Sequence, residues 1–172
     1  MKQDLPTTNQ TGFTLIELLI TTALTVMLLL TITTMFMTFL IGNSKTNIRK
    51  NVKEEGLHAI SRIEFILKNA RYYDDTFQPC QSNLTTIRVV NFDGGTTTYS
   101  EVSDNGITKI ASNSSILTSS DVDTNSTLRF DCSGEVGNRQ IKASFTLEKL
   151  APTLNASQNI TENFETIVNL RN

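Results

Sequence analysis

The stretch Gly12-Phe13-Thr14-Leu15-Ile16-Glu17-Leu18-Leu19 opens an apolar run that continues to Ile41. Between Phe13 and Ile41 the chain has 29 residues and a single charged side chain, that of Glu17. An α-helix rises 1.5 Å per residue and a bilayer core needs about 20 apolar residues, so this run is long enough to span a membrane. A carboxylate at the centre of such a helix costs about 2.5–3.5 kcal/mol or more, so the presence of Glu17 needs an explanation.

The residues around Glu17 provide one. The series Gly-Phe-Thr-Leu-Ile-Glu at 12–17, after a short polar leader, resembles the cleavage and assembly signal of type IV pilins and type II secretion pseudopilins. The resemblance implies that a prepilin peptidase cuts the chain after Gly12 and methylates the new amino terminus, Phe13. It also implies that Glu17 pairs with the amino terminus of a neighbouring subunit, which turns two costly buried charges into one compensated pair.

Residues 1–12 form the expected cytoplasmic leader, which is polar and has no apolar stretch. A secretory signal peptide differs, because its apolar region of about 7–15 residues precedes the cleavage site. The alternative interpretation of the motif is an ordinary signal anchor in which Glu17 lies near the membrane interface.

The charges that flank the apolar run conflict with this orientation. Lys2 precedes the run, and four basic residues follow it: Lys45, Arg49, Lys50 and Lys53. The positive-inside rule alone would therefore place the carboxyl end in the cytoplasm. The resemblance implies the opposite, because the leader must face a cytoplasmic peptidase.

Residues 42–73 are predicted to continue the helix of residues 13–41. Apolar or small residues recur at spacings of three and four: Ile48, Val52, Gly56, Ala59, Ile63, Leu67 and Ala70. This amphipathic period predicts a stripe that packs against a sheet. Gly42-Asn43-Ser44 is a candidate kink or the point where the helix leaves the lipid, and Pro79 bars any further helix.

Residues 74–172 are predicted to form a β-rich extracytoplasmic domain. Strand-forming and alternating patterns indicate strands at 85–90, 96–102, 107–111, 126–132, 140–150 and 164–170. Asp104-Asn105-Gly106 is a strong hairpin turn, and a loop is expected from Pro152 to Thr161. Together these patterns predict an α+β fold, with a long amino-terminal helix packed on an antiparallel sheet of four to six strands.

The chain has two cysteines, Cys80 and Cys132, and neither belongs to a CxxC motif or a pattern of paired His and Cys ligands. Outside the cytoplasm a Cys80–Cys132 disulfide is expected, and two unrelated buried thiols are the alternative. The bridge would close a loop of about 50 residues and stabilise the fold by about 4 kcal/mol in the chain-entropy model.

No motif of a common enzyme class occurs in the chain, and His58, the one histidine, has no evident catalytic partners. Asp121-Val122-Asp123-Thr124-Asn125 has the alternating oxygen ligands that open a calcium loop. Ser126 and Cys132, however, stand where that loop needs glycine and an acid, so a plain turn is predicted. We therefore predict no enzyme activity, metal or other cofactor, and the net charge of −2 gives no sign of nucleic-acid binding.

The order of elements and the absence of proline from the apolar run favour a minor pilin or pseudopilin that resembles the J or W class. The resemblance implies four partners: other pilin or pseudopilin subunits, the prepilin peptidase, the inner-membrane assembly platform, and membrane lipid before assembly. It also implies a single-pass membrane protein that later joins a cell-surface or periplasmic filament. The alternative function is a permanently membrane-anchored extracellular binding module that uses residues 74–172.

Overall fold

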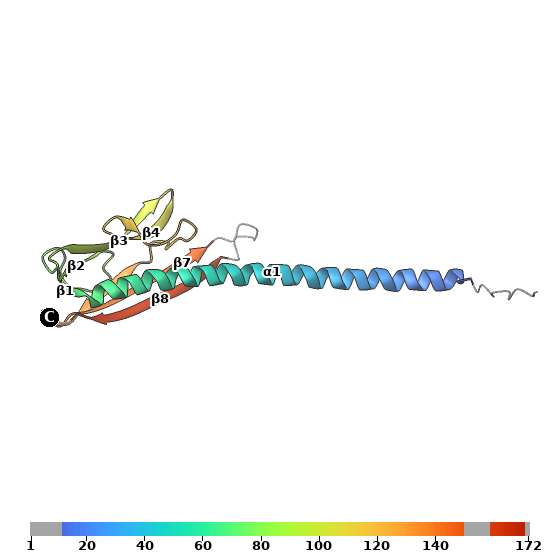
Figure 1. The fold of residues 1–172 in the computed structure, drawn as a ribbon, viewed down its shortest axis with the longest axis horizontal. Helices are drawn as coiled ribbons and strands as arrows, with labels where there is room; N and C mark the ends of the chain where they lie inside the picture. Colours follow the sequence, from blue (N-terminus) through green and yellow to red (C-terminus); the bar gives the residue numbers. More distant parts are fainter. Residues whose placement is uncertain (1–11, 150–158, 171–172) are drawn as a thin grey trace, which may run out of the picture. The chain divides into compact units, whose positions relative to one another are not determined.

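The computed structural model describes residues 12–149 and 159–170 of the chain (Figure 1). The chain divides into two compact units, Met1–Ser44 and Lys45–Asn172. One helix, α1 (Leu15–Lys68), contributes to both units and continues through Gly42-Asn43-Ser44 without interruption. The predicted leader, residues 1–12, lies outside the described residues apart from Gly12.

In the first unit, the described part of α1 is apolar and exposed. The helix is long and apolar enough to cross a membrane, and none of its most apolar window is buried. The seven threonines of this part each donate their hydroxyl to a carbonyl three or four residues earlier, at 2.7–3.0 Å: Thr21, Thr22, Thr25, Thr31, Thr33, Thr34 and Thr38. Because the helix satisfies these hydroxyls itself, the threonines add little polarity to its surface.

The second unit contains two antiparallel sheets, which confirms the predicted α+β fold. Five strands pair in the order β1-β2-β3-β4-β5: Ala70–Tyr73, Ile87–Asn91, Thr96–Asp104, Ile107–Ser112 and Ser115–Ile116. Three more pair in the order β6-β7-β8: Arg129–Ser133, Gln140–Lys149 and Ile160–Asn169. A single sheet was expected. Two isolated bridges pair this second sheet with segments outside the strands: Leu84 with Phe130 of β6, and Asp123 with Glu148 of β7.

The predicted hairpin turn is confirmed between β3 and β4. Asp104 pairs with Ile107, and the two residues between them have positive φ, 53° for Asn105 and 80° for Gly106. Such angles suit a two-residue turn whose twist matches that of the strands. Of the loop expected from Pro152 to Thr161, residues 152–158 lie outside the described part of the chain, whereas Ile160 and Thr161 already belong to β8.

The helix ends at Lys68, and the prediction that it reaches residue 73 is wrong. The backbone N–H of Asn69 donates to the carbonyls of Phe65 and Ile66, and its side-chain amide also donates to Phe65 at 2.7 Å. Ala70–Tyr73 then pairs with β2 as strand β1. Tyrosine favours strands, and this pairing with a distant segment overrides the helical period that Ala70 continues.

The predicted stripe of α1 is confirmed in the second unit. Val52, Gly56, Ala59, Ile63 and Leu67 of the stripe are buried, with Ile60 beside them, whereas Ile48 is half-buried. They belong to one core with residues of both sheets, among them Tyr99 of β3 and Phe130 of β6. In Figure 1, β8 runs along this part of α1, in agreement with the contact between Gly56 and Phe164.

Gly56 allows this close approach. A Cβ atom at Gly56 would lie 2.0 Å from Cζ of Phe164, far inside ordinary contact distance. The ring of Phe164 is buried and stacks on Phe145 of β7, with ring centroids 5.3 Å apart. Because packed interiors leave no room for an added methyl group, glycine is required where the helix meets this ring.

We expect Gly56→Ala to lower the free energy of unfolding by about 1–3 kcal/mol because it overpacks the contact. Alanine is the better helix former by about 1 kcal/mol, so helix propensity alone predicts the opposite sign. Gly42→Ala is the matched control, since a Cβ there meets no atom within 4 Å. Denaturant unfolding of the full chain in detergent measures both. Adding Phe164→Leu to Gly56→Ala should recover part of the loss, and equal effects of the two glycine exchanges would contradict this packing.

Stability should also fall at high pH because of Tyr99. This side chain is fully buried, and burial raises the pKa of its phenol to about 12, against smaller opposing effects of Ser112 and Arg62. The folded state therefore holds the proton more tightly than the unfolded chain, whose tyrosine has a pKa of 10.0. The contribution of Tyr99 to stability is complete below pH 10 and is lost as the pH rises towards 12.

The expected loss over this window is about 2–3 kcal/mol, since one pKa unit corresponds to about 1.4 kcal/mol. Urea unfolding of the full chain at a series of alkaline pH values measures it. Tyr99→Phe has no phenol proton and should show a shallower fall between pH 10 and 12. Equal slopes for the two proteins would rule out this origin of the pH dependence.

Candidate processing and assembly site

The backbone around Gly12 and Phe13 is open to a peptidase. Both residues precede the first turn of α1 and are exposed, Phe13 to 81%. Thr14 closes the end of the helix: its Oγ1 accepts a hydrogen bond from the backbone N–H of Glu17 at 3.3 Å, and its carbonyl accepts one from Leu18 at 3.2 Å. The candidate cleavage bond, between Gly12 and Phe13, therefore lies just ahead of a capped helix.

Sequence analysis missed this role of Thr14, although a signal was present. A Thr followed three residues later by Glu is the capping-box pattern, in which the hydroxyl satisfies a backbone donor that the helix leaves unpaired. The same spacing places Glu17 in the first turn, where the helix dipole favours a negative charge. Thr14 and Glu17 thus have a structural role at the start of α1 in addition to any role in assembly.

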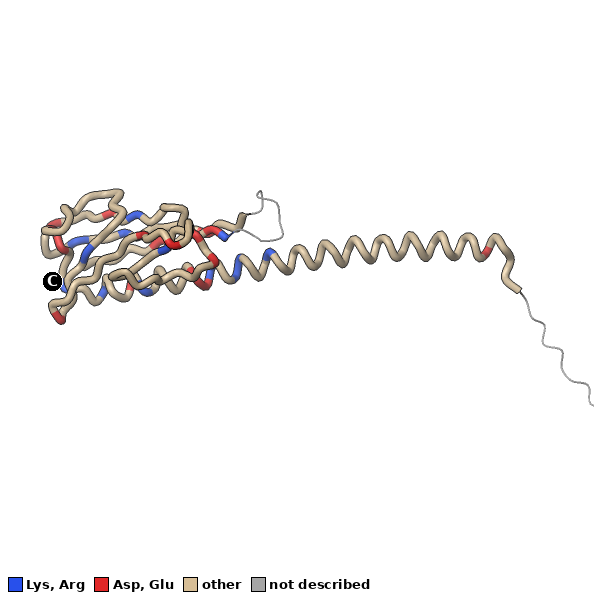
Figure 2. Tube along the Cα trace, turned by 90° about the horizontal axis from the view of Figure 1, so that it is seen from above, with Lys and Arg blue, Asp and Glu red and all other residues tan. Residues whose placement is uncertain are grey.

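The carboxylate of Glu17 is available to a partner outside the chain. Within the described residues it belongs to none of the ion pairs, and its surroundings are apolar side chains that are themselves exposed. Along the chain, no charged residue stands between Glu17 and Lys45, and the tube of α1 in Figure 2 is accordingly tan over a long stretch. A lone carboxylate on an apolar helix needs a cation wherever that helix is buried.

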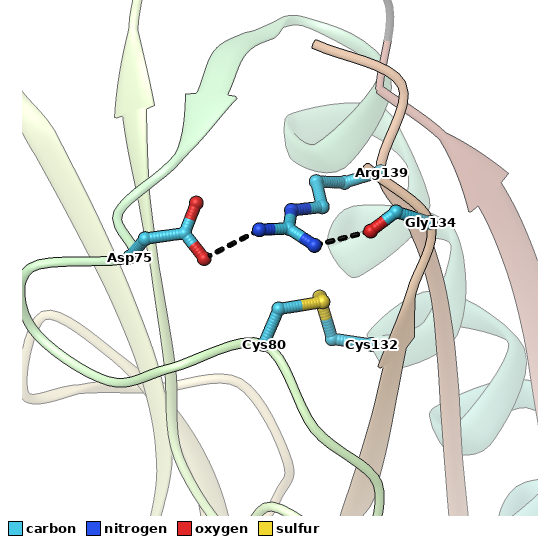
Figure 3. Close-up of a disulfide and its surroundings, with 5 residues drawn as sticks. All are labelled: Asp75, Cys80, Cys132, Gly134 and Arg139. Atoms are coloured by element: carbon cyan, nitrogen blue, oxygen red, sulfur yellow. Dashed lines mark hydrogen bonds and ion pairs between the residues drawn. A yellow bond between two sulfur atoms is a disulfide. The ribbon is translucent and has the colours of Figure 1, made fainter. Parts of the chain in front are cut away.

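Cys80 and Cys132 are joined by a disulfide in the structure, with Cα atoms 5.1 Å apart. The bridge connects the segment between β1 and β2 to β6, and therefore ties the two sheets together. Figure 3 shows Arg139 beside it, where the guanidinium bonds the Gly134 carbonyl and lies 2.9 Å from Asp75. These contacts join the segment after β1 to the loop between β6 and β7.

The two aspartates of the candidate calcium loop have partners within the protein. Asp121 Oδ2 lies 3.1 Å from Lys149 Nζ. Asp123 Oδ1 accepts hydrogen bonds from the backbone N–H groups of Thr108 and Asn125, at 3.1 and 2.7 Å. Among residues 12–149 and 159–170, no group of three or more acidic, His or Cys side chains is arranged to hold a metal ion.

His58 is exposed on α1 and lines an open groove of about 680 Å³ with Glu54, Glu55 and Asp121. Glu55 accepts a hydrogen bond from the backbone of Ser119 at 3.3 Å, and Asp121 pairs with Lys149. The groove therefore brings together residues that sequence analysis treated separately.

Comparison with known proteins bears on the amino-terminal site. Residues 7–33 match the model of the prokaryotic N-terminal methylation motif, a stretch that includes Gly12, Phe13 and Glu17. Searches of curated proteins and of solved structures gave no match. The motif overlaps the start of α1, which is the one helix within residues 12–149 and 159–170 that is long and apolar enough to cross a membrane. Together they support a pilin-like or pseudopilin protein and are consistent with a membrane anchor at this helix.

Proposed function

We propose that this chain is a minor pilin or pseudopilin, a structural subunit of a filament of the type IV pilus or type II secretion kind. The match of residues 7–33 to the N-terminal methylation motif is the observation that carries the proposal. The peptidase cuts after Gly12, Phe13 becomes the methylated amino terminus, and the apolar part of α1 packs among the helices of neighbouring subunits. The second unit then faces outward from the filament.

The properties of α1 support this use of the helix. Its apolar side chains are exposed, so they suit either lipid or a bundle of similar helices, and its threonine hydroxyls are satisfied internally. The same surface therefore serves the subunit before and after it leaves the bilayer. The J or W class is part of the proposal, on the grounds of element order and a span without proline.

The amino terminus of the mature protein tests this proposal. Purified from cells that contain a prepilin peptidase, the protein should begin with N-methylated Phe13, as read by mass spectrometry of its first peptide. From cells without the peptidase it should keep residues 1–12. Gly12→Val should block cleavage, because the added side chain stands at the bond that is cut, and Gly42→Val, which lies within α1 and away from that bond, is the control.

A mature protein that begins at Met1 in the presence of the peptidase would contradict the proposal. That result would instead favour a permanently anchored extracellular binding module, which keeps its leader and remains in the membrane.

A further inference from the structure

A group of cations follows the apolar part of α1. Lys45, Arg49, Lys50 and Lys53, here called the basic band, fall within nine residues, and Lys45 comes four residues after Ile41. The chain has no acidic residue between Glu17 and Glu54, so the band is the first charge after the apolar run. In Figure 2, these blue positions begin where the uncharged stretch of the helix ends.

The second unit neutralises only part of this charge. Arg49 Nε lies 2.8 Å from Oε1 of Glu162 on β8, whose side chain is 20% exposed. Lys50 Nζ lies 3.7 Å from Glu54 on the helix, but both side chains are exposed to more than 60%, and such pairs contribute little. Lys45, which is half-buried, and Lys53, which is exposed, form no ion pair with any residue the structure describes. The three lysines thus remain available to a partner.

We propose that the basic band binds the anionic headgroups of phospholipids in the leaflet where the apolar run ends. The recognised chemistry is a phosphodiester anion held at a surface. Each Lys or Arg close to such a surface strengthens binding about fivefold, and the attraction falls off within about 8–10 Å at physiological salt. Lysine suits this position because its long stem lies along apolar surface while its ammonium group reaches the headgroups.

The order of charges along the helix fits a juxtamembrane anchor. An apolar run comes first, the basic band second, and the acidic pair Glu54 and Glu55 follows only at the start of the groove near His58. Lipid binding gives the band a role on whichever side of the membrane the second unit lies. In a subunit that is extracted into a filament, these contacts would oppose extraction.

The inference requires only that the apolar run lies in a bilayer. It makes no use of cleavage at Gly12 or of pairing by Glu17, so its failure and the failure of the proposed function are separate results.

Lipid titration of the full chain in a neutral detergent tests the proposal, with bound lipid counted by native mass spectrometry. Phosphatidylglycerol should be retained at least about tenfold more tightly than phosphatidylcholine, and added salt should reduce this preference. The variant Lys45→Gln/Lys50→Gln/Lys53→Gln should bind the two lipids within about twofold of each other, while it keeps the Arg49–Glu162 pair that fastens the helix to β8.

The matched control is Lys68→Gln/Arg71→Gln/Lys142→Gln, which removes the same charge elsewhere in the second unit and should keep the preference. Circular dichroism should show that both variants are folded. Equal retention of the two lipids by the unaltered chain would overturn the proposal, as would an equal loss in the control. If inorganic phosphate competes as effectively as phosphatidylglycerol, the basic band is a site for free anions and the proposal of a lipid site is refuted. A preference for phosphatidylglycerol over phosphatidylcholine that survives in the variant without the three lysines would also refute the proposal.

Discussion

Filaments are expected to exclude the variant Glu17→Gln, although the protein is made, cleaved and folded as before. Glutamine keeps the size of the side chain and is accepted in the capping box with Thr14, so the start of α1 should be unchanged. What is lost is the negative charge. In the proposed assembly this charge meets the amino terminus of a neighbouring subunit within a bundle of apolar helices.

The expected effect is large, because breaking a buried charge pair by removing one partner costs about 3–5 kcal/mol. At about 1.4 kcal/mol per tenfold, that corresponds to a loss of incorporation of roughly a hundredfold or more. Quantitative immunoblotting of sheared filaments, relative to protein left in the membrane, measures this loss. Glu17→Val should behave in the same way, even though valine is better tolerated in lipid than a carboxylate.

Glu54→Gln is the control for this experiment. It changes the same residue type on the same helix, but at an exposed position of the second unit that pairs only weakly with Lys50. It should leave incorporation unchanged. If Glu17→Gln is incorporated as well as the unaltered chain, while Phe13 is still found as the amino terminus, the charge-pair role of Glu17 is refuted.

Loss of the Cys80–Cys132 bridge is expected to have the largest effect on stability. The two cysteines are 52 residues apart in the chain, and closing a loop of that length stabilises a fold by about 4 kcal/mol in the chain-entropy model. The disulfide also reinforces a backbone pairing of the same two segments, because Leu84, between β1 and β2, forms an isolated β-bridge with Phe130 of β6. Without the disulfide, the segment between β1 and β2 loses its covalent attachment to β6.

Denaturant unfolding of the full chain in detergent, with and without reductant, measures this contribution. We expect reduction to lower the free energy of unfolding by about 3–5 kcal/mol. Cys80→Ala/Cys132→Ala should resemble the reduced protein and should not respond to reductant. The double alanine variant is preferable to serine because Cys132 is buried in the core, where a hydroxyl without a partner carries its own cost. A shift of less than about 1 kcal/mol on reduction would show that the bridge contributes little.

Several features of this protein could be predicted because they are encoded locally. The processing motif consists of consecutive residues at 12–17, and the apolar run is evident from composition alone. The turn at Asn105-Gly106 follows from the few residues that tolerate positive φ. The alternating pattern of β7 also indicated its buried face, on which Ile141, Ala143, Phe145 and Leu147 all lie.

The remaining features depend on which segments meet in space. Ala70 continues the helical period, yet it begins strand β1 because β2 offers it a partner about 20 residues further on. Gly56 resembles an ordinary weak point of a helix until Phe164, more than 100 residues away, is placed against it. The division of the strands between two sheets likewise reflects long-range pairing.

The sequence by itself therefore determined the amino-terminal signal, the apolar helix and the main strands, because each depends on neighbouring residues. Only the tertiary structure decided the end of α1, the need for glycine at position 56 and the pairing of Arg49 with Glu162. These depend on contacts between distant segments, whose geometry is set by the packing of the whole core and not by the local preferences of any one stretch.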